Sequence, residues 1–321
     1  AHILHLPSSL EVTNFAHGQA QLIKYEIPEG SILDGTKLMD LGTRHHANIL
    51  IGAVERDDEV TIPSGDFVLR KGDKLSFVGE RRHTKEFFSH IGVNTHSVKN
   101  TLIIGGGKAA YYLAKQLISR GIKVKIIENS FERCEELSIL LPDAVIINGD
   151  GTEQALLKEE GIETCQSFVP LTGIDEENIM LTLYAKQVSN AKVITKLNRI
   201  TFTNVINSLD LGSVISPKYI TSEAIIAYVR AKKNSMNCNI ETLYHMYDSR
   251  VEAIEFFVSE NSNVTDIPLR DLKLKKHLLI CFINRNGKII IPTGNDSIQK
   301  NDTVMIITTH TGFTNLQDIM E

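Results

Sequence analysis

The chain has 321 residues, with 34 Lys+Arg and 39 Asp+Glu, so its formal net charge is 34 − 39 = −5. A hydrophobic content of 42% with 23% charged residues excludes wholesale disorder, and the length suggests two or three domains. The acidic balance argues against a nucleic-acid-coating protein. The longest apolar runs, such as Leu278–Ile283, are about six residues, whereas a membrane helix needs about 20.

The ends and the cysteines add little. The chain begins without Met, which we interpret as a processed product or an excised segment. The four cysteines are far apart and form no CxxC pair, so they are interpreted as reduced thiols rather than metal ligands.

An internal repeat occupies both ends of the chain. Ile62-Pro63 matches Ile291-Pro292 and Asp73 matches Asp302 at one offset (302 − 73 = 229), while Leu38 matches Leu269 at 269 − 38 = 231. Each copy predicts a short Leu-Asp-Leu helix, a buried strand, a polar turn, a second strand ending at a proline and a last strand. The repeat therefore predicts two small α+β modules of about 80 residues each. The predicted buried and last strands are Ile49–Val54 and Leu75–Val78, then Leu278–Ile283 and Val304–Ile307.

Between the copies, apolar strand-like runs alternate with helix-like stretches. Such β-α-β alternation with short crossovers predicts a doubly wound parallel sheet covered on both faces. The predicted strands are Thr101–Gly105, Lys123–Ile127, Ala144–Asn148, Ser167–Leu171 and Lys192–Lys196. The predicted helices are Ala109–Ser119, Phe131–Leu141, Thr152–Glu160 and Glu176–Val188.

A further helix is predicted over Ser222–Arg230, after Pro217. It is too apolar to be solvated all round, so we expect it to pack on a neighbouring domain or on another subunit. The fold class is thus α/β, a Rossmann-like sheet domain flanked by two α+β modules. We place the first module at 1–95, the sheet domain at 100–220, the connecting helix at 221–235 and the second module at 236–321.

The first central strand leads into Gly105-Gly106-Gly107-Lys108-Ala109-Ala110, a G-x-G-x-x-A pattern that opens a helix. Gly105 permits the tight turn, Gly107 lets a pyrophosphate approach the backbone, and Ala110 lets the helix lie close to the strand. The helix amides and dipole then meet the phosphates. The alternative is a tight turn that holds no ligand.

Glu128 ends the second strand, 21 residues after Gly107 (128 − 107 = 21). A carboxylate there accepts hydrogen bonds from both ribose hydroxyls and repels a 2′-phosphate, which favours NAD(H) over NADP(H). Asp150 is a candidate for the adenosine half, or else caps the next helix. Lys196 ends the fifth strand, where a cation could neutralise a phosphate, although a surface lysine is the commoner outcome.

No catalytic constellation accompanies this motif. A hydride-transfer enzyme needs a proton donor or acceptor beside the nicotinamide, yet no histidine lies between Lys99 and Tyr244. We therefore favour a non-enzymatic regulator. The rival hypotheses are an NAD-dependent oxidoreductase and an assembly module whose nucleotide site is degenerate.

The central part resembles the RCK-type (KTN, TrkA-N) nucleotide-binding domain, on Leu102–Gly107, Glu128, Gly149-Asp150-Gly151-Thr152 and Leu171-Thr172. The flanking copies resemble the RCK-C (TrkA-C) module, on Pro63-x-Gly65…Lys71-Gly72-Asp73 and Pro292-x-Gly294…Lys300-Asn301-Asp302. The opening segments Leu6–Val12 and Phe15–Gly18 look like the joint after an upstream nucleotide domain. As a whole the chain resembles the TrkA-type subunits of bacterial Trk potassium-uptake systems, lacking the first nucleotide domain.

The resemblance implies a cytosolic regulator, peripheral on the inner face of the membrane, that gates a membrane-embedded potassium transporter and forms homo-oligomers. It implies NAD(H) as ligand, with ATP or ADP as the other candidates. It implies that Gly105, Gly106, Gly107, Lys108 and Ala109 hold the pyrophosphate and Glu128 the ribose. Leu171 and Thr172 would line the adenosine side, and Lys196 would face a phosphate, although an arginine is common there.

Overall fold

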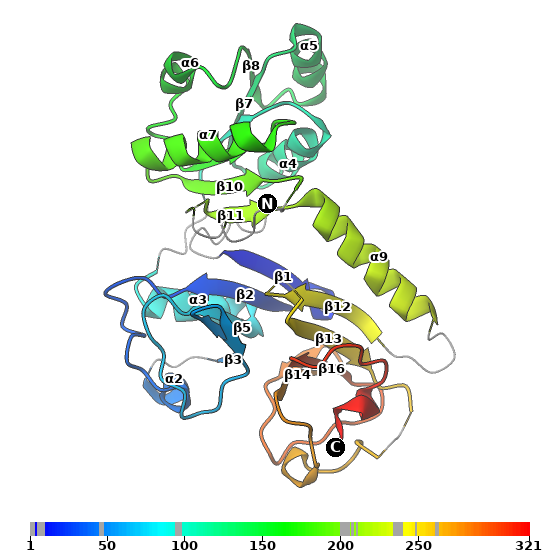
Figure 1. Ribbon diagram of the computed structural model, residues 1–321. Helices are drawn as coiled ribbons and strands as arrows, with labels where there is room; N and C mark the ends of the chain where they lie inside the picture. The colour runs from blue at the N-terminus through cyan, green and yellow to red at the C-terminus, as the bar shows by residue number, and fades with distance from the viewer. Residues whose placement is uncertain are drawn as a thin grey trace. The chain divides into compact units, whose positions relative to one another are not determined.

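A computed structural model gives the fold (Figure 1). It describes residues 4, 10–44, 48–93, 98–199, 206, 209, 211–233, 240–247, 249–260 and 263–321. The chain divides into two compact units, residues 1–10 with 95–220 and residues 11–94 with 221–321. The first unit contains the parallel-sheet domain, and the second contains both repeat copies.

The parallel-sheet domain has six strands in the order β11-β10-β9-β6-β7-β8, and every pair in it is parallel. Numbered by their appearance within the domain, the strands run 6-5-4-1-2-3, the doubly wound order of the Rossmann fold. The predicted fold class is therefore confirmed. The strands are β6 (Asn100–Ile104), β7 (Lys123–Glu128), β8 (Val145–Asn148), β9 (Ser167–Pro170), β10 (Lys192–Lys196) and β11 (Ser213–Ile215).

The helices of this domain bury one apolar face each against the sheet. In α4 (Lys108–Ile118), the buried residues Ala110, Ala114 and Leu117 recur at helical spacing. Ser130 caps α5 (Phe131–Leu140) by accepting a hydrogen bond from the Arg133 amide. The other two helices of the domain are α6 (Gln154–Glu159) and α7 (Asp175–Val188). The long helix α9 (Pro217–Lys233) follows β11, and from Thr221 onward it belongs to the second unit. α9 is longer than predicted because Pro217 serves as its first residue, where proline needs no N–H partner.

The first module is an antiparallel sheet ordered β1-β2-β5-β3-β4. Its strands are β1 (Glu11–Phe15), β2 (Ala20–Glu26), β3 (Ile49–Arg56), β4 (Glu59–Thr61) and β5 (Lys74–Glu80), with the helices α2 (Leu38–Arg44) and α3 (Arg81–His90). Glu11 and Val12, expected in a joint, pair with β2 instead. Residues 6–9 of that expected joint lie outside the described residues.

The second module repeats this sheet in the order β12-β13-β16-β14-β15. Its strands are β12 (Ile240–Met246), β13 (Val251–Phe257), β14 (Leu278–Arg285), β15 (Lys288–Ile290) and β16 (Thr303–Thr308). The expected Leu-Asp-Leu helix is an α-helix only in the first copy. In the second it is the short 3₁₀ turn η2 (Leu269–Asp271), and the chain ends with another such turn, η3 (Leu316–Ile319).

Both modules contain the same buried ion pair. Arg56 Nε donates to Asp73 Oδ1 at 2.7 Å and its Nη2 reaches the Val68 carbonyl at 2.8 Å. Arg285 makes the equivalent bonds, to Asp302 at 2.9 Å and to the Ser297 carbonyl at 2.7 Å. This pair joins the third strand to the turn before the last strand, which explains why Arg and Asp recur at matching positions.

The two modules pack against each other through one face of each sheet. Their shared core includes Val78 and Ala53 of the first module and Met305 and Ile307 of the second. On β16 the alternate residues Val304 and Ile306 enter the second module's own core instead. Both faces of that strand are therefore buried, which accounts for its continuous apolar sequence.

In the described part of the chain, no helix combines the length and the apolar character needed to cross a membrane.

Candidate functional site

The turn from β6 into α4 lies where the strand order of the parallel sheet reverses, between β6 and β9. Gly105 begins the turn with φ of +93°, and its amide donates to the Ile127 carbonyl at 2.8 Å. A Cβ at Gly105 would lie 3.1 Å from the Leu171 carbonyl oxygen. Only glycine therefore fits this backbone without strain.

Gly106 packs beneath the Glu128 side chain. Its amide donates to Glu128 Oε2 at 2.6 Å, and the Ser130 amide donates to Oε1 at 2.8 Å. A Cβ at Gly106 would strike Leu137 Cδ1 at 2.6 Å. Glu128 is thus held at the turn by one backbone amide on each oxygen, and each oxygen retains a second lone pair.

Gly107 differs from its two neighbours. Its backbone is extended (φ −65°, ψ −175°), and an added Cβ would meet no atom of the described residues within 4 Å, its two chain neighbours aside. Neither strain nor packing within the chain explains this glycine. The open space lies at the N-terminus of α4, where Gly107 is the N-cap residue.

Among the described residues, no side chain caps the N-terminus of α4 and no acid lies in its first turn. In this it differs from α5, which Ser130 caps, and from α7, which begins with Asp175, Glu176 and Glu177. Lys108 and Ala109 are exposed there. The positive end of the helix dipole thus faces the open space, an arrangement suited to an anionic group such as a pyrophosphate.

Arg133, which the sequence analysis missed, lies beside this turn. Its Nε donates to the Gly106 carbonyl at 2.8 Å, and its Nη1 pairs with Glu136. An arginine near the start of a helix opposes the helix dipole, and that mismatch is the one signal that could have drawn attention to it.

Asp150 is occupied by its own loop. Its Oδ1 accepts hydrogen bonds from the Thr152 amide at 2.8 Å and the Thr152 hydroxyl at 2.7 Å. The Thr152 amide, and then its hydroxyl, hold the pKa of the Asp150 carboxyl below its usual value. These bonds form a tight turn before α6. Asp150 does not cap α6, as the sequence allowed, because the N-cap residue of that helix is Glu153 and no side chain bonds there.

The ends of β9 and β10 meet through Asn178, which is fully buried. Asn178 accepts from the Thr172 amide at 3.0 Å and donates to the Lys196 carbonyl at 3.0 Å. Lys196 Nζ donates to the Thr172 carbonyl at 2.9 Å. Leu171 and Thr172 therefore lie at the edge of the Gly105 turn, with the Lys196 ammonium tied to the same strand end.

Asn178 was also missed, although a signal existed. It shares a stripe with the buried residues Leu181, Thr182 and Ala185, at spacings of three, four and seven. An amide on the buried face of a helix must find partners, so this position predicts a tie to the backbone.

The structure thus gathers Gly105, Gly106, Gly107, Glu128 and Leu171 around one turn, with Thr172 and Lys196 at the adjacent strand ends. A parallel sheet with this glycine turn, in one chain with paired α+β modules, defines the RCK-type class of proteins. Among solved structures, the chain is similar to the GsuK RCK domain (TM-score 0.54, 16% identity, 95% of this chain and 65% of that chain). It is also similar to the GsuK channel bound to NAD (TM-score 0.53, 17% identity, 95% and 54%).

The chain belongs to the TrkA family. The TrkA-N domain model matches residues 101–217, and the TrkA-C domain model matches residues 22–92 and 253–320. It is 32% identical to the Trk system potassium uptake protein TrkA homolog 1 of Methanosarcina mazei, over 95% of this chain and 67% of that protein. It is 28% identical to the TrkA protein of Halomonas elongata, over 95% and 66%. The chain therefore spans about two thirds of the length of these relatives.

Proposed function

We propose that this chain is a non-catalytic regulator that binds NAD(H) at the Gly105–Ala110 turn and controls a membrane potassium-uptake protein. The observation that carries the ligand half is Gly107. In the part of the chain that the structure describes, an added Cβ at this glycine meets nothing and no side chain caps the helix that it begins. A pyrophosphate on the α4 amides accounts for both facts.

Glu128 would select the ribose. Its oxygens keep lone pairs for the two hydroxyls of an unmodified ribose, while a 2′-phosphate would meet a carboxylate. Arg133 would neutralise little of the charge of such a phosphate, since its guanidinium is already bonded to the Gly106 carbonyl and paired with Glu136. NAD(H) is therefore favoured over NADP(H), with ATP and ADP as competitors that share the ribose.

The potassium half rests on family membership. The relatives are named as Trk system potassium uptake proteins, and a structural neighbour is a channel bound to NAD. A ligand can drive regulation only if it binds two conformations with different affinity. We propose that nucleotide binding shifts such an equilibrium and that a membrane-embedded transporter subunit senses it at the inner face of the membrane. The absence of histidine from residues 100–243 favours this role over hydride transfer.

Thermal unfolding with NADH, NAD, NADPH and ATP tests the ligand. At a hundredfold excess over Kd, a ligand stabilises the domain by about 2.7 kcal/mol. We expect NADH or NAD to raise the unfolding midpoint more than NADPH does. No shift with any of these nucleotides would refute the ligand half.

Gly107→Val separates the site from the fold. Because an added side chain meets no atom of the described residues, the variant should lower the unfolding midpoint only by the small cost of a poorer N-cap residue, and it should lose the nucleotide-induced shift. Gly106→Val is the matched control, and it should lower the midpoint without any ligand, since its side chain would strike Leu137 and Glu128. Potassium uptake by cells that carry Gly107→Val then tests regulation, and unchanged, still nucleotide-responsive uptake would contradict it.

A further inference from the structure

Arg133 is a partly buried cation beside the carboxylate that would hold the ribose. Glu128 and Arg133 both bond Gly106, whose amide donates to Glu128 Oε2 at 2.6 Å and whose carbonyl accepts from Arg133 Nε at 2.8 Å. Ser130 also bonds both of them. Its amide donates to Glu128 Oε1 at 2.8 Å, and its hydroxyl accepts from the Arg133 amide at 3.3 Å. The acid and the cation therefore lie at one corner of the candidate site.

Two helices begin at this corner. Gly107 is the N-cap residue of α4, and Ser130 is the N-cap residue of α5. The N-terminus of a helix carries a partial positive charge, so a cation there is disfavoured. Arg133 is nevertheless the third residue of α5, and only 24% of its side chain is exposed. With two helix N-termini and a guanidinium, the corner would suit a phosphate unless acidic side chains offset its charge.

Two acidic side chains offset that charge in different ways. Glu128 lies where the ribose hydroxyls would bind. Glu136, three residues after Arg133 on α5, accepts a hydrogen bond from Arg133 Nη1 through its Oε2. Among the described residues, Arg133 Nη2 makes no hydrogen bond and remains a free donor. Glu136 therefore controls how much of the arginine's charge is available to a ligand.

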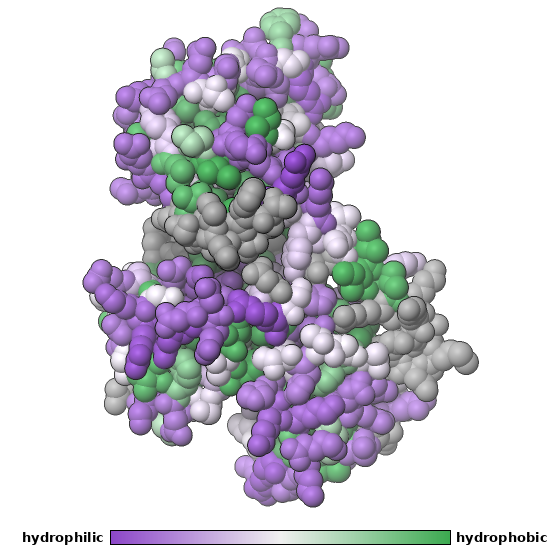
Figure 2. Space-filling model, in the orientation of Figure 1, coloured by the Kyte–Doolittle hydropathy of each residue, from purple (hydrophilic) through white to green (hydrophobic). Residues whose placement is uncertain are grey.

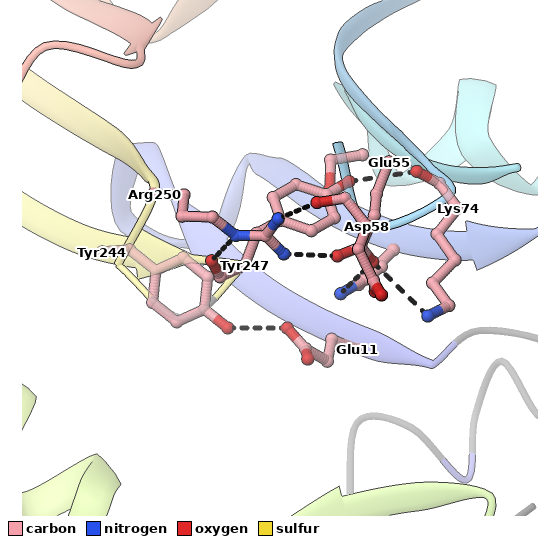
Figure 3. A network of polar contacts seen from close by, with 9 residues as sticks. Glu11, Glu55, Asp58, Lys74, Tyr244, Tyr247 and Arg250 are labelled. Carbon is pink, nitrogen blue, oxygen red and sulfur yellow. Dashed lines mark hydrogen bonds and ion pairs between the residues drawn. The ribbon is translucent and has the colours of Figure 1, made fainter. Parts of the chain in front are cut away.

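The pair of Arg133 and Glu136 differs from the ion pair that Arg250 makes with Glu55. The Glu55 side chain is 9% exposed and lies in a network of polar contacts within the second unit (Figure 3). The Glu136 side chain is 58% exposed. Because an exposed ion pair three residues apart on a helix contributes little to stability, the fold does not explain Glu136. Its charge can also be removed without unfolding the domain.

We propose that Glu136 is a specificity-determining residue, which excludes a 2′-phosphate by keeping the Arg133 guanidinium paired. The inference rests on the proposed function, since it assumes a dinucleotide at the Gly105–Ala110 turn. Glu128 repels the phosphate directly, and Glu136 withholds the cation that would neutralise it. Without Glu136, the guanidinium can offer Nη1 and Nη2 together to phosphate oxygens, a geometry that arginine favours.

Titration of the full chain with NADH and with NADPH, followed by the fluorescence of the reduced nicotinamide, tests the proposal. Glu136→Gln keeps the size of the side chain and removes its charge. We expect the Kd for NADPH to fall about tenfold, because a 2′-phosphate then meets an unpaired guanidinium. The Kd for NADH should change by less than about twofold, because an unmodified ribose carries no charge at that position.

Glu135→Gln is the matched control. It removes the same charge from the adjacent, exposed residue of α5. We expect it to change the ratio of the NADPH and NADH dissociation constants by less than about twofold, because the charge of an exposed side chain is screened by water and salt. An equal gain in NADPH affinity in Glu135→Gln and Glu136→Gln would overturn the proposal, since net charge alone would then explain it.

Arg133→Gln completes a double-mutant cycle. Added to Glu136→Gln, it should abolish the gain in NADPH affinity, because the gain depends on the guanidinium. In the chain that retains Glu136, the same change should alter the ratio of the two dissociation constants much less. A gain that survives Arg133→Gln would overturn the proposal.

The two ligands separate this inference from the function on which it rests. NADH binding by the unmodified chain supports the proposed function, whatever the variants do. A chain that binds NADH, with the same preference over NADPH in Glu136→Gln as without the change, would overturn the inference alone. A chain that binds neither dinucleotide would refute the proposed function and this inference with it.

Discussion

Glu55 and Glu255 lie in the contact between the modules and respond to it in opposite ways. Burial alone would raise the pKa of Glu55, but Lys24, Lys74 and Arg250 outweigh it and hold that pKa below its usual value. For Glu255 burial dominates, and the bonds from Thr242 and Ala16 only partly offset it, so its pKa is raised. One carboxylate is thus stabilised in its charged form and the other is not.

The signs of these shifts predict opposite pH dependences. Glu55, with a lowered folded pKa, contributes stability above its unfolded pKa, and that stability is lost as the pH falls through the folded value. Glu255 binds a proton more tightly when folded, so the free energy of unfolding falls as the pH rises from about 4.5, its ordinary value, through the raised pKa.

Glu255→Gln should therefore remove the fall in the free energy of unfolding that Glu255 causes as the pH rises. A glutamine can accept from the Ala16 amide and donate to the Thr242 hydroxyl, so both partners are kept while the buried charge is removed. We expect the variant to match the unmodified chain near pH 4 and to exceed it in free energy of unfolding at pH 7. Urea unfolding at both pH values measures this, and Glu55→Gln is the control, which should be less stable than the unmodified chain at pH 7. A Glu255→Gln variant less stable at pH 7 would contradict the role assigned to Glu255.

For single residues, the sequence predicted which positions lie at the site better than it predicted their hydrogen-bond partners. The strand-end position of Glu128 was evident from its spacing, but its bonds to the Gly106 and Ser130 amides depend on side-chain geometry that no spacing encodes. For Asp150 the sequence suggested a local bond, but it suggested a cap on the next helix, whereas the bond closes an Asx-type turn with Thr152 ahead of that helix.

Among elements, the repeated Arg–Asp pair explains how two divergent copies keep one fold. Asp73 and Asp302 are each 1% exposed, and each accepts both from its arginine and from a backbone amide, that of Arg70 or of Gln299. The arginine thereby neutralises a buried carboxylate and fixes the turn before the last strand.

Arg56→Met should cost about 2–3 kcal/mol, since it leaves the Asp73 carboxylate buried and unpaired while Arg56 itself was partly in water. Arg285→Met should cost a similar amount, because the second copy repeats the geometry. Denaturant unfolding measures both. Arg56→Met with Asp73→Asn in one chain should recover part of the loss, and full additivity of the two changes would argue against the pair.

The module strands that the sequence missed share one property. β1 with β2, and β12 with β13, are antiparallel pairs that complete their sheets by pairing with β5 and β16, far away in the sequence. The sequence of β13, for example, lacks the alternation that indicates a strand, because Ile254 and Phe256 are buried in its own module's core and Val251 and Ala253 in the shared core. The parallel domain was predicted closely because its strands alternate with helices. Of its described strands, β11, which is three residues long, was not predicted.

In the whole molecule, the repeat predicted two modules but not that they share a core. A continuous apolar run such as Val304–Ile307 indicates a strand buried on both faces, without identifying what covers the second face. The covering surface here belongs to a segment more than 200 residues away, because Ile307 packs in one core with Ala20 and Ala53 (307 − 53 = 254).

The helix α9 offers a surface for assembly of copies. Its side chains Ile225 and Val229 are 57% and 45% exposed, and Figure 2 shows hydrophobic residues gathered along it. Exposed isoleucine and valine side chains at helical spacing are typical of an interaction surface. We expect the chain to form homo-oligomers that bury this face.

Ile225→Asp should then lower the mass of the assembly, measured by light scattering or native mass spectrometry, without changing the circular dichroism. Ser222→Asp, at an exposed position on the same helix, serves as the control and should leave the mass unchanged. A monomeric unmodified chain, or an unchanged mass in Ile225→Asp, would contradict this role for α9.

The thiol of Cys281 lies in the core that the two modules share, so its reactivity can report on their separation. Cys281 of the second module is completely buried, and a Cβ at Gly52 of the first module would lie 3.6 Å from its sulfur. Burial raises the pKa of the Cys281 thiol above the usual range. An alkylating reagent can reach that sulfur only when the modules separate or unfold, so its rate of modification measures how often they part. Nucleotides, salt and the transporter can each be added to such a measurement. The alkylation rate then reports how each of them changes the frequency with which the two modules separate.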